Sequence, residues 1–201
     1  MIRNKDVIYE AFFNSKEDKL YYNQLKEITS LSYSSLQTVL KKLKENREIE
    51  EEKTKSNTYY SLTNKCKAIE FTKITKNKIE DLNLNVRVPL KEFIKLSPTE
   101  IFTIILFGSA SIKQEKKGSD IDLLVVLHKF ENDELQKLYE KEIRDKFEKI
   151  KEEINTRSIY PLSLFITNKE EYLKNKDYVI SEATLKGFPI KNQLQLYENE
   201  N

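Results

Sequence analysis

One segment decides how this sequence is interpreted: LFGSASIKQEKKGSDIDLLVV, residues 106–126. In it an apolar run ends in Gly108-Ser109, and ten residues later Asp120-Ile121-Asp122 opens a second apolar run. Short apolar runs of this kind are typical of buried strands, and Gly108 and Gly118 bound the loop between them. The segment therefore predicts two strands joined by a polar loop with a glycine near each end.

The residue types in this loop suit a metal ion and a phosphate. Side chains alternate along a strand, so Asp120 and Asp122 are expected on the same side, about 7 Å apart. Two carboxylates placed in this way can hold a hard cation such as Mg²⁺. Gly108 lets the backbone approach a phosphate, and a helix beginning at Ser109 would offer free N–H groups to it. The alternative is that Asp120 caps the strand, Asp122 faces solvent and Gly108-Ser109 is an ordinary turn.

This pattern resembles the nucleotidyltransferase fold of the DNA polymerase beta superfamily, in particular its small prokaryotic members, the minimal nucleotidyltransferases. The resemblance covers about residues 90–201. It implies transfer of NMP from Mg²⁺-NTP to a hydroxyl acceptor, with pyrophosphate leaving. By this resemblance Asp120 and Asp122 are the catalytic, Mg²⁺-binding residues, and Gly108, Ser109 and Ser119 bind the nucleotide. Because such proteins often act as antitoxins that nucleotidylate a toxin, a protein partner such as a toxin is implied as well.

The chain departs from the superfamily pattern in two places. The Arg-Gly that many relatives carry after the Gly-Ser is replaced by Ile112-Lys113. The strand expected at residues 161–166 has no acid, and Ser163 stands where active members place a third carboxylate. Glu170 and Glu171 follow that strand and are expected to cap it or to face solvent. The sequence thus favours nucleotide binding over transfer, and the alternative function is a catalytically silent transcription regulator that responds to a nucleotide or a partner.

Beyond residue 100 the chain alternates between apolar strand patterns and amphipathic helix patterns. Strands are predicted at residues 101–107, 120–127 and 162–167, with a long helix at 132–154 and two shorter helices after residue 168. The segment FPI at 188–190 suggests an edge strand. This order predicts an α/β (α+β) domain, a small mixed sheet with flanking helices.

The first 65 residues have a different pattern. Helices are predicted at residues 2–13 and 23–29, followed by a third helix with Leu36, Val39, Leu40 and Leu43 on one face and Ser32 as its N-cap. Residues 48–63 predict a hairpin. Three helices followed by a hairpin are typical of a winged helix-turn-helix that binds double-stranded DNA. The alternative is a helical domain that only dimerises. The candidate DNA-binding residues are Ser34, Ser35, Gln37, Thr38, Lys41, Lys42 and Lys55.

The predicted domains are residues 1–65, a helical linker at 66–89, and residues 90–201. A homodimer is expected, because winged-helix proteins commonly bind two half-sites. The 35 basic and 33 acidic residues give a net charge of +2, so net charge itself is no argument for nucleic-acid binding. One cysteine (Cys66) and one histidine (His128) exclude a disulfide framework and a Cys/His zinc site. With no apolar run long enough for a membrane, we expect a cytoplasmic protein.

Overall fold

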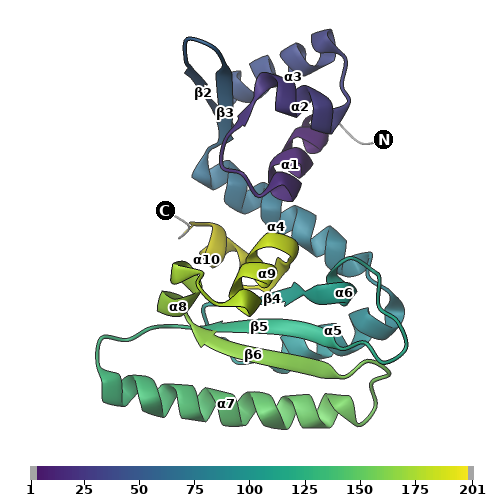
Figure 1. The fold of residues 1–201 in the computed structure, drawn as a ribbon, viewed down its shortest axis with the longest axis vertical. Coiled ribbons are helices and arrows are strands. Elements are labelled where there is room, and N and C mark those ends of the chain that lie inside the picture. The colour runs from purple at the N-terminus through teal and green to yellow at the C-terminus, as the bar shows by residue number, and fades with distance from the viewer. Residues whose placement is uncertain (1–3, 199–201) are drawn as a thin grey trace. The chain divides into compact units, whose positions relative to one another are not determined.

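The computed structural model describes residues 4–198 and divides into two compact units (Figure 1). Unit 1 comprises Met1–Ile74 with Tyr197–Asn201, and unit 2 comprises Thr75–Leu196. The division falls inside one helix, α4 (Asn64–Glu80), whereas the sequence predicts boundaries at residues 65 and 89. No helix within residues 4–198 is long and apolar enough to cross a membrane.

Unit 1 has the predicted order of three helices followed by a hairpin, and Ile2, at the start of the first predicted helix, lies outside the described residues. A short strand that the sequence does not predict, β1, pairs with β3, so the antiparallel sheet has the order β1-β3-β2. The elements are α1 (Asn4–Ser15), β1 (Leu20–Tyr21), α2 (Tyr22–Thr29), α3 (Tyr33–Glu45), β2 (Ile49–Lys53) and β3 (Thr58–Leu62).

Helix α3 forms for the reasons that its sequence indicates. The side chain of Ser32 accepts a hydrogen bond from the backbone N–H of Ser35, which caps the first turn. One face of the helix is buried in unit 1, and its opposite face stays polar. The buried residues are the four predicted: Leu36, Val39, Leu40 and Leu43.

Unit 2 contains a mixed sheet, as predicted, and its strand order is β6-β5-β4-β7. Strands β5 and β6 run parallel, while β4 is antiparallel to both β5 and β7. The elements are α5 (Leu84–Leu96), β4 (Thr103–Phe107), α6 (Gly108–Ser111), β5 (Ile121–Leu127), α7 (Asp133–Asn155), β6 (Leu162–Asn168), α8 (Lys169–Lys174), α9 (Tyr178–Lys186), β7 (Phe188–Lys191) and α10 (Gln193–Glu198).

Both faces of the central strands are covered. Every residue of β5 is buried except Asp122, which is half-buried. Helix α7 packs against β6 and α5, and the rings of Phe93 and Phe147 stack with centroids 5.5 Å apart. Helix α9 packs against β4, β5 and α6. Because its neighbours on β5 are buried, Asp122 is the polar exception on an otherwise apolar strand.

Helix α5 crosses the end of the linker that the sequence predicts at residues 66–89. It begins at Leu84, and Pro89 lies inside it. A proline at this point removes one backbone hydrogen bond and crowds the preceding turn, which usually ends a helix. Here Val86, Pro89, Leu90 and Phe93 form one buried stripe, so burial of apolar surface outweighs the lost hydrogen bond.

We expect the Gly187→Ala substitution to destabilise unit 2, because Gly187 connects α9 to β7 where the two elements are closest. A Cβ there would overlap the carbonyl oxygen of Ala183 and lie 2.8 Å from the carbonyl oxygen of Leu106. Such overpacking costs roughly 1–3 kcal/mol of unfolding free energy, measurable by urea denaturation. Leu185→Ala, at a side chain 64% exposed on the same helix, is the control and changes stability by about 0.5 kcal/mol or less. Equal losses in the two variants would contradict the packing argument.

Candidate functional site

Gly108 and Asp122 form the centre of the candidate site. Phe107, the last residue of β4, pairs with Asp122 on β5, so the Gly-Ser turn begins beside the carboxylate. Gly108 has φ +67°, in the left-handed region, and a Cβ at this position would overlap Asp122 Oδ2. Only glycine satisfies both conditions, and the loop backbone therefore lies directly against the carboxylate, as the phosphate-binding interpretation requires.

Asp120 does not lie on the strand. Strand β5 begins at Ile121, so Asp120 ends the preceding loop and is exposed. The strand thus begins one residue later than the sequence predicts, while the order of exposed Asp120, buried Ile121 and half-buried Asp122 agrees with the predicted alternation. The two carboxylates nevertheless interact, since the charge of Asp120 contributes to the raised pKa of Asp122.

The pKa of Asp122 is raised above its ordinary value, and burial is the largest cause. The negative charges of Asp120 and then Glu182 add to the rise, because a second carboxylate disfavours ionisation. Ser163, the partner of Asp122 on the parallel strand β6, opposes the shift through a hydrogen bond from its hydroxyl to the carboxylate. Asp122 therefore interacts with two other carboxylates, those of Asp120 and Glu182, and with the hydroxyl of Ser163.

The remaining predicted nucleotide-binding residues lie in the loop itself. Ser109 follows Gly108 in the four-residue helix α6 and is half-exposed. The hydroxyl oxygen of Ser119 accepts a hydrogen bond of 2.8 Å from the backbone N–H of Lys116, which stabilises a turn. The ammonium of Lys113 forms an ion pair with Asp81, so this lysine is not simply a solvated side chain of the loop. Ser109 and Ser119 both precede the two aspartates in sequence, and Ser119 also has a structural part in the turn.

Two side chains near Asp122 had no place in the sequence prediction. Glu182 lies on α9, which packs on β4 and β5, and its side chain is only 25% exposed while paired with Lys186 at 3.3 Å. Phe165 lies on the same face of the sheet as Ser163, remains 43% exposed, and contacts Phe107 edge to face at 6.2 Å. Neither position carries a local signal, because each depends on which elements pack together.

The two acids directly after β6 pair with a lysine of their own helix rather than with the residues of this site. Glu170 and Glu171 are exposed on α8, and both pair with Lys174, at 2.8 Å and 2.9 Å. This agrees with the expectation that they cap the strand or face solvent. His128 is half-buried against the Phe102 ring, with centroids 6.0 Å apart. Glu182, and not Glu170 or Glu171, is therefore the carboxylate that acts on Asp122 in addition to Asp120.

The donor set fits a cation only together with a substrate. Within residues 4–198 no group of three or more His, Cys, Asp or Glu side chains is arranged to hold a metal ion. Asp120 and Asp122 supply two carboxylates, however, and Mg²⁺ is commonly held by one or two carboxylates plus substrate phosphates. Of the two carboxylates, Asp120 is exposed and Asp122 is half-buried.

The candidate DNA-binding residues lie on α3 and in the hairpin loop of unit 1. Among them Ser35 is half-buried and the other six are exposed. Two hydroxyls serve the helix itself: Ser35 Oγ accepts a hydrogen bond from Ser32, and Thr38 Oγ1 donates one to the carbonyl of Ser34. The structure therefore leaves Gln37, Lys41, Lys42 and Lys55 as the long exposed polar side chains of the set.

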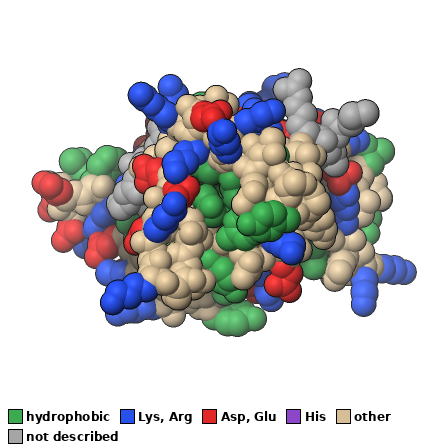
Figure 2. All heavy atoms as spheres, turned by 90° about the horizontal axis from the view of Figure 1, so that it is seen from above, with side chains coloured by type: hydrophobic (Ala, Val, Ile, Leu, Met, Phe, Trp, Pro, Cys, Tyr) green, Lys and Arg blue, Asp and Glu red, His purple; other side chains and the backbone are tan. Residues whose placement is uncertain are grey.

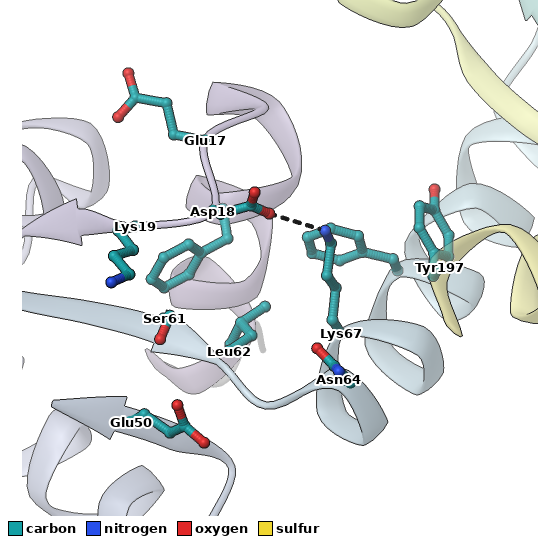
Figure 3. Close-up of a pocket in the computed structure, with 11 residues that line it drawn as sticks. Glu17, Asp18, Lys19, Glu50, Ser61, Leu62, Asn64, Lys67 and Tyr197 are labelled. Atoms are coloured by element: carbon teal, nitrogen blue, oxygen red, sulfur yellow. Dashed lines mark hydrogen bonds and ion pairs between the residues drawn. The ribbon is translucent and has the colours of Figure 1, made fainter. Parts of the chain in front are cut away.

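Unit 1 also has a cavity of about 220 Å³ beside β1, β3 and the start of α4 (Figure 3). Figure 3 shows Asp18 and Lys67 pointing toward one another, and they form an ion pair of 3.0 Å. The Lys67 ammonium also lies 6.0 Å from the Phe71 ring centroid. Since Glu17, Asp18 and Glu50 face Lys19 and Lys67, the lining charges largely offset one another. We attribute this cavity to packing in unit 1.

Comparison with known proteins supports the assignment of unit 2. Residues 86–185 match the family model of the nucleotidyltransferase domain. No curated protein and no solved structure matches the chain. The match supports the nucleotidyltransferase superfamily and a general function in nucleotidyl transfer, and the winged helix-turn-helix assignment of unit 1 stays a prediction.

The raised pKa of Asp122 predicts a stability effect. The pKa of an aspartate in an unfolded chain is about 3.9. At pH values between about 3.9 and the raised pKa of Asp122 in the folded protein, the folded state binds more protons than the unfolded chain. The free energy of unfolding therefore falls as pH rises through this interval. We expect Asp122→Asn to raise the thermal midpoint of the full chain at pH 7 without divalent cations, and the gain to vanish below about pH 3.9.

The matched control is Asp145→Asn, the same chemical change at an exposed position on α7. Its thermal midpoint should match that of the wild type at every pH, because an exposed substitution of this kind changes the free energy of unfolding by about 0.5 kcal/mol or less. Calorimetry of the three proteins across pH 3–8 makes the comparison. An Asp122→Asn midpoint below the wild type at pH 7 would show that the ionised carboxylate stabilises the fold.

Proposed function

With residues 86–185 supported as a nucleotidyltransferase domain, we propose that this chain transfers NMP from Mg²⁺-NTP to a hydroxyl acceptor at the Gly108–Asp122 site. The observation that carries the proposal is the close approach of the Gly108 backbone to the Asp122 carboxylate. In this proposal the Gly108 backbone binds a phosphate of the NTP, and the neighbouring Asp122 carboxylate binds the Mg²⁺ that accompanies it. Pyrophosphate is the leaving group.

Each residue of the site has a definite part in this proposal. Gly108, Ser109 and Ser119 contact the triphosphate, and Asp120 and Asp122 hold Mg²⁺. Domains of this family generally use an NTP and a divalent metal. When bound, the cation neutralises charge that develops on the phosphates during in-line displacement. Phe165, exposed on the face that carries Asp122, offers an apolar contact to the nucleoside.

Deprotonation of the acceptor needs an acid residue that β6 does not supply. Ser163 has replaced that acid and donates a hydrogen bond to Asp122. Glu182 is the carboxylate that approaches from α9, and in this proposal it accepts the acceptor's proton. The alternative is a silent domain that binds Mg²⁺-NTP and regulates transcription. It is favoured by the absence of any acid between Pro161 and Ile166.

The test uses α-labelled NTPs with Mg²⁺, purified full-length chain and an extract of the source cell. Label should appear on a macromolecule with the wild type, and Asp122→Asn should lower the rate at least about 100-fold, since loss of a metal ligand costs several kcal/mol of transition-state stabilisation. Asp145→Asn serves as the control and should transfer label like the wild type.

The outcomes separate the two functions. Label that depends on Asp122 establishes transfer, and its position identifies the acceptor, which we propose to be a protein partner such as a toxin. Retention of Mg²⁺-NTP on the wild type but not on Asp122→Asn, with no label transferred, supports the silent regulator. Label that persists unchanged in Asp122→Asn rejects the site.

We further propose that unit 1 binds double-stranded DNA as a winged helix-turn-helix, as a homodimer on two half-sites. Its element order and the exposed Lys41 and Lys42 of α3 support this proposal. Glu50, Glu51 and Glu52 of β2 weaken phosphate contact along that strand, so the contacts are assigned to α3 and to Lys55 in the hairpin loop.

Lys42→Ala should weaken binding of the full chain to a mixed-sequence duplex. If Lys42 contacts a phosphate, its removal lowers the slope of log affinity against log salt by about one. Fluorescence anisotropy at several salt concentrations measures the slope. The control Lys141→Ala removes an exposed lysine of α7 and should leave the slope unchanged. A wild type without measurable duplex binding would reject this second proposal.

A further inference from the structure

A broad groove in unit 1 lies between α2, α3 and the β2–β3 hairpin. Its volume is about 730 Å³, within the range of pockets that take a drug-sized ligand. It is lined by the first turn of α2, one side of α3 and the strands of the hairpin. Two of the candidate duplex-binding residues, Gln37 and Lys41, line the groove, whereas Ser34, Thr38 and Lys42 do not. The groove therefore overlaps the predicted duplex-binding face of α3 only in part.

The charge of this groove suits a polyanion. Four lysines and one glutamate line it: Lys26, Lys41, Lys44, Lys53 and Glu51. Glu51 pairs with both Lys44, at 2.8 Å, and Lys53, at 3.2 Å, and these contacts hold its pKa below the ordinary value. One carboxylate shared between two lysines leaves an excess of positive charge. Figure 2 shows one face of the molecule, on which lysine and arginine side chains lie among apolar and acidic ones.

The groove also contains three tyrosines: Tyr22, Tyr33 and Tyr60. The rings of Tyr22 and Tyr33 meet edge to face at 5.5 Å, and the Tyr33 hydroxyl accepts a hydrogen bond of 2.8 Å from Gln37. Tyr33 is thus held at its edge and at its hydroxyl while 57% of the residue stays exposed. A ring fixed in this way offers a flat surface on which a base can stack.

From this combination we infer that the groove binds single-stranded nucleic acid, with phosphates against the lysines and a base on Tyr33. Lysines beside exposed aromatic rings are the usual means of binding a single strand without sequence preference. A duplex presents paired, stacked bases, so its phosphates would contact the lysines while the tyrosine rings gained no partner. The inference does not depend on the nucleotidyl-transfer site, and it assigns a single strand to a groove that shares Gln37 and Lys41 with the predicted duplex-binding face.

The test measures binding of the full chain to a labelled oligodeoxythymidylate of about ten nucleotides and to a duplex of mixed sequence, by fluorescence anisotropy. Tyr33→Ala should weaken single-strand binding by about tenfold, while Tyr33→Phe, which keeps the ring, should stay within about twofold. Lys26→Ala should weaken it as well. Lys141→Ala, at an exposed position on α7 of unit 2, should leave it unchanged.

Several results would overturn the inference. One is tighter binding of the duplex together with its loss in Tyr33→Ala, which would make the groove part of the duplex interface. Another is equal weakening by Tyr33→Phe and Tyr33→Ala, which would assign the effect to the hydroxyl. Unchanged single-strand binding in both Tyr33→Ala and Lys26→Ala, with native circular dichroism, would also reject it. Loss of transfer in Asp122→Asn has no bearing on these outcomes.

Discussion

The contact between the Gly108 backbone and the Asp122 carboxylate is the constraint on which the polar edge of unit 2 depends. It fixes the end of β4 against β5 through the pairing of Phe107 with Asp122. It also excludes every side chain at position 108, through overlap with Asp122 Oδ2 and through the left-handed backbone. The proposed phosphate position therefore lies where the backbone of this turn is closest to the Asp122 carboxylate.

This arrangement places negative charge where the fold does not stabilise it. Burial raises the pKa of Asp122, and the charges of Asp120 and Glu182 raise it further. The hydroxyl of Ser163 offsets only part of the effect. A site in which three carboxylates repel one another is poorly optimised for stability, which is the usual pattern where function and stability compete. The same reasoning separates this site from the Asp18–Lys67 cavity, where opposite charges pair.

The sequence predicts those features that depend on local pattern. The buried face of α3 and its Ser32 cap follow from helical spacing, and the strands around Gly108-Ser109 follow from short apolar runs. It does not predict features that depend on tertiary pairing. Asp120 lies outside β5 because strand pairing begins at Ile121, and Pro89 remains helical because its stripe is buried. The groove of unit 1 likewise joins α2, α3 and the hairpin, which only the folded chain brings together.

Glu182 and Ser163 show the same limit within the site itself. A strand without an acid indicates an incomplete site when only the strand is considered. In the folded chain α9 packs on β4 and β5, with Gly187 allowing the close approach at its end, and Glu182 comes near Asp122 from outside the strand. An acid at position 163 would add a further repelling charge beside Asp122, whereas serine donates a hydrogen bond that orients the carboxylate. The serine on β6 and the glutamate on α9 are thus physically compatible in a way that two acids would not be.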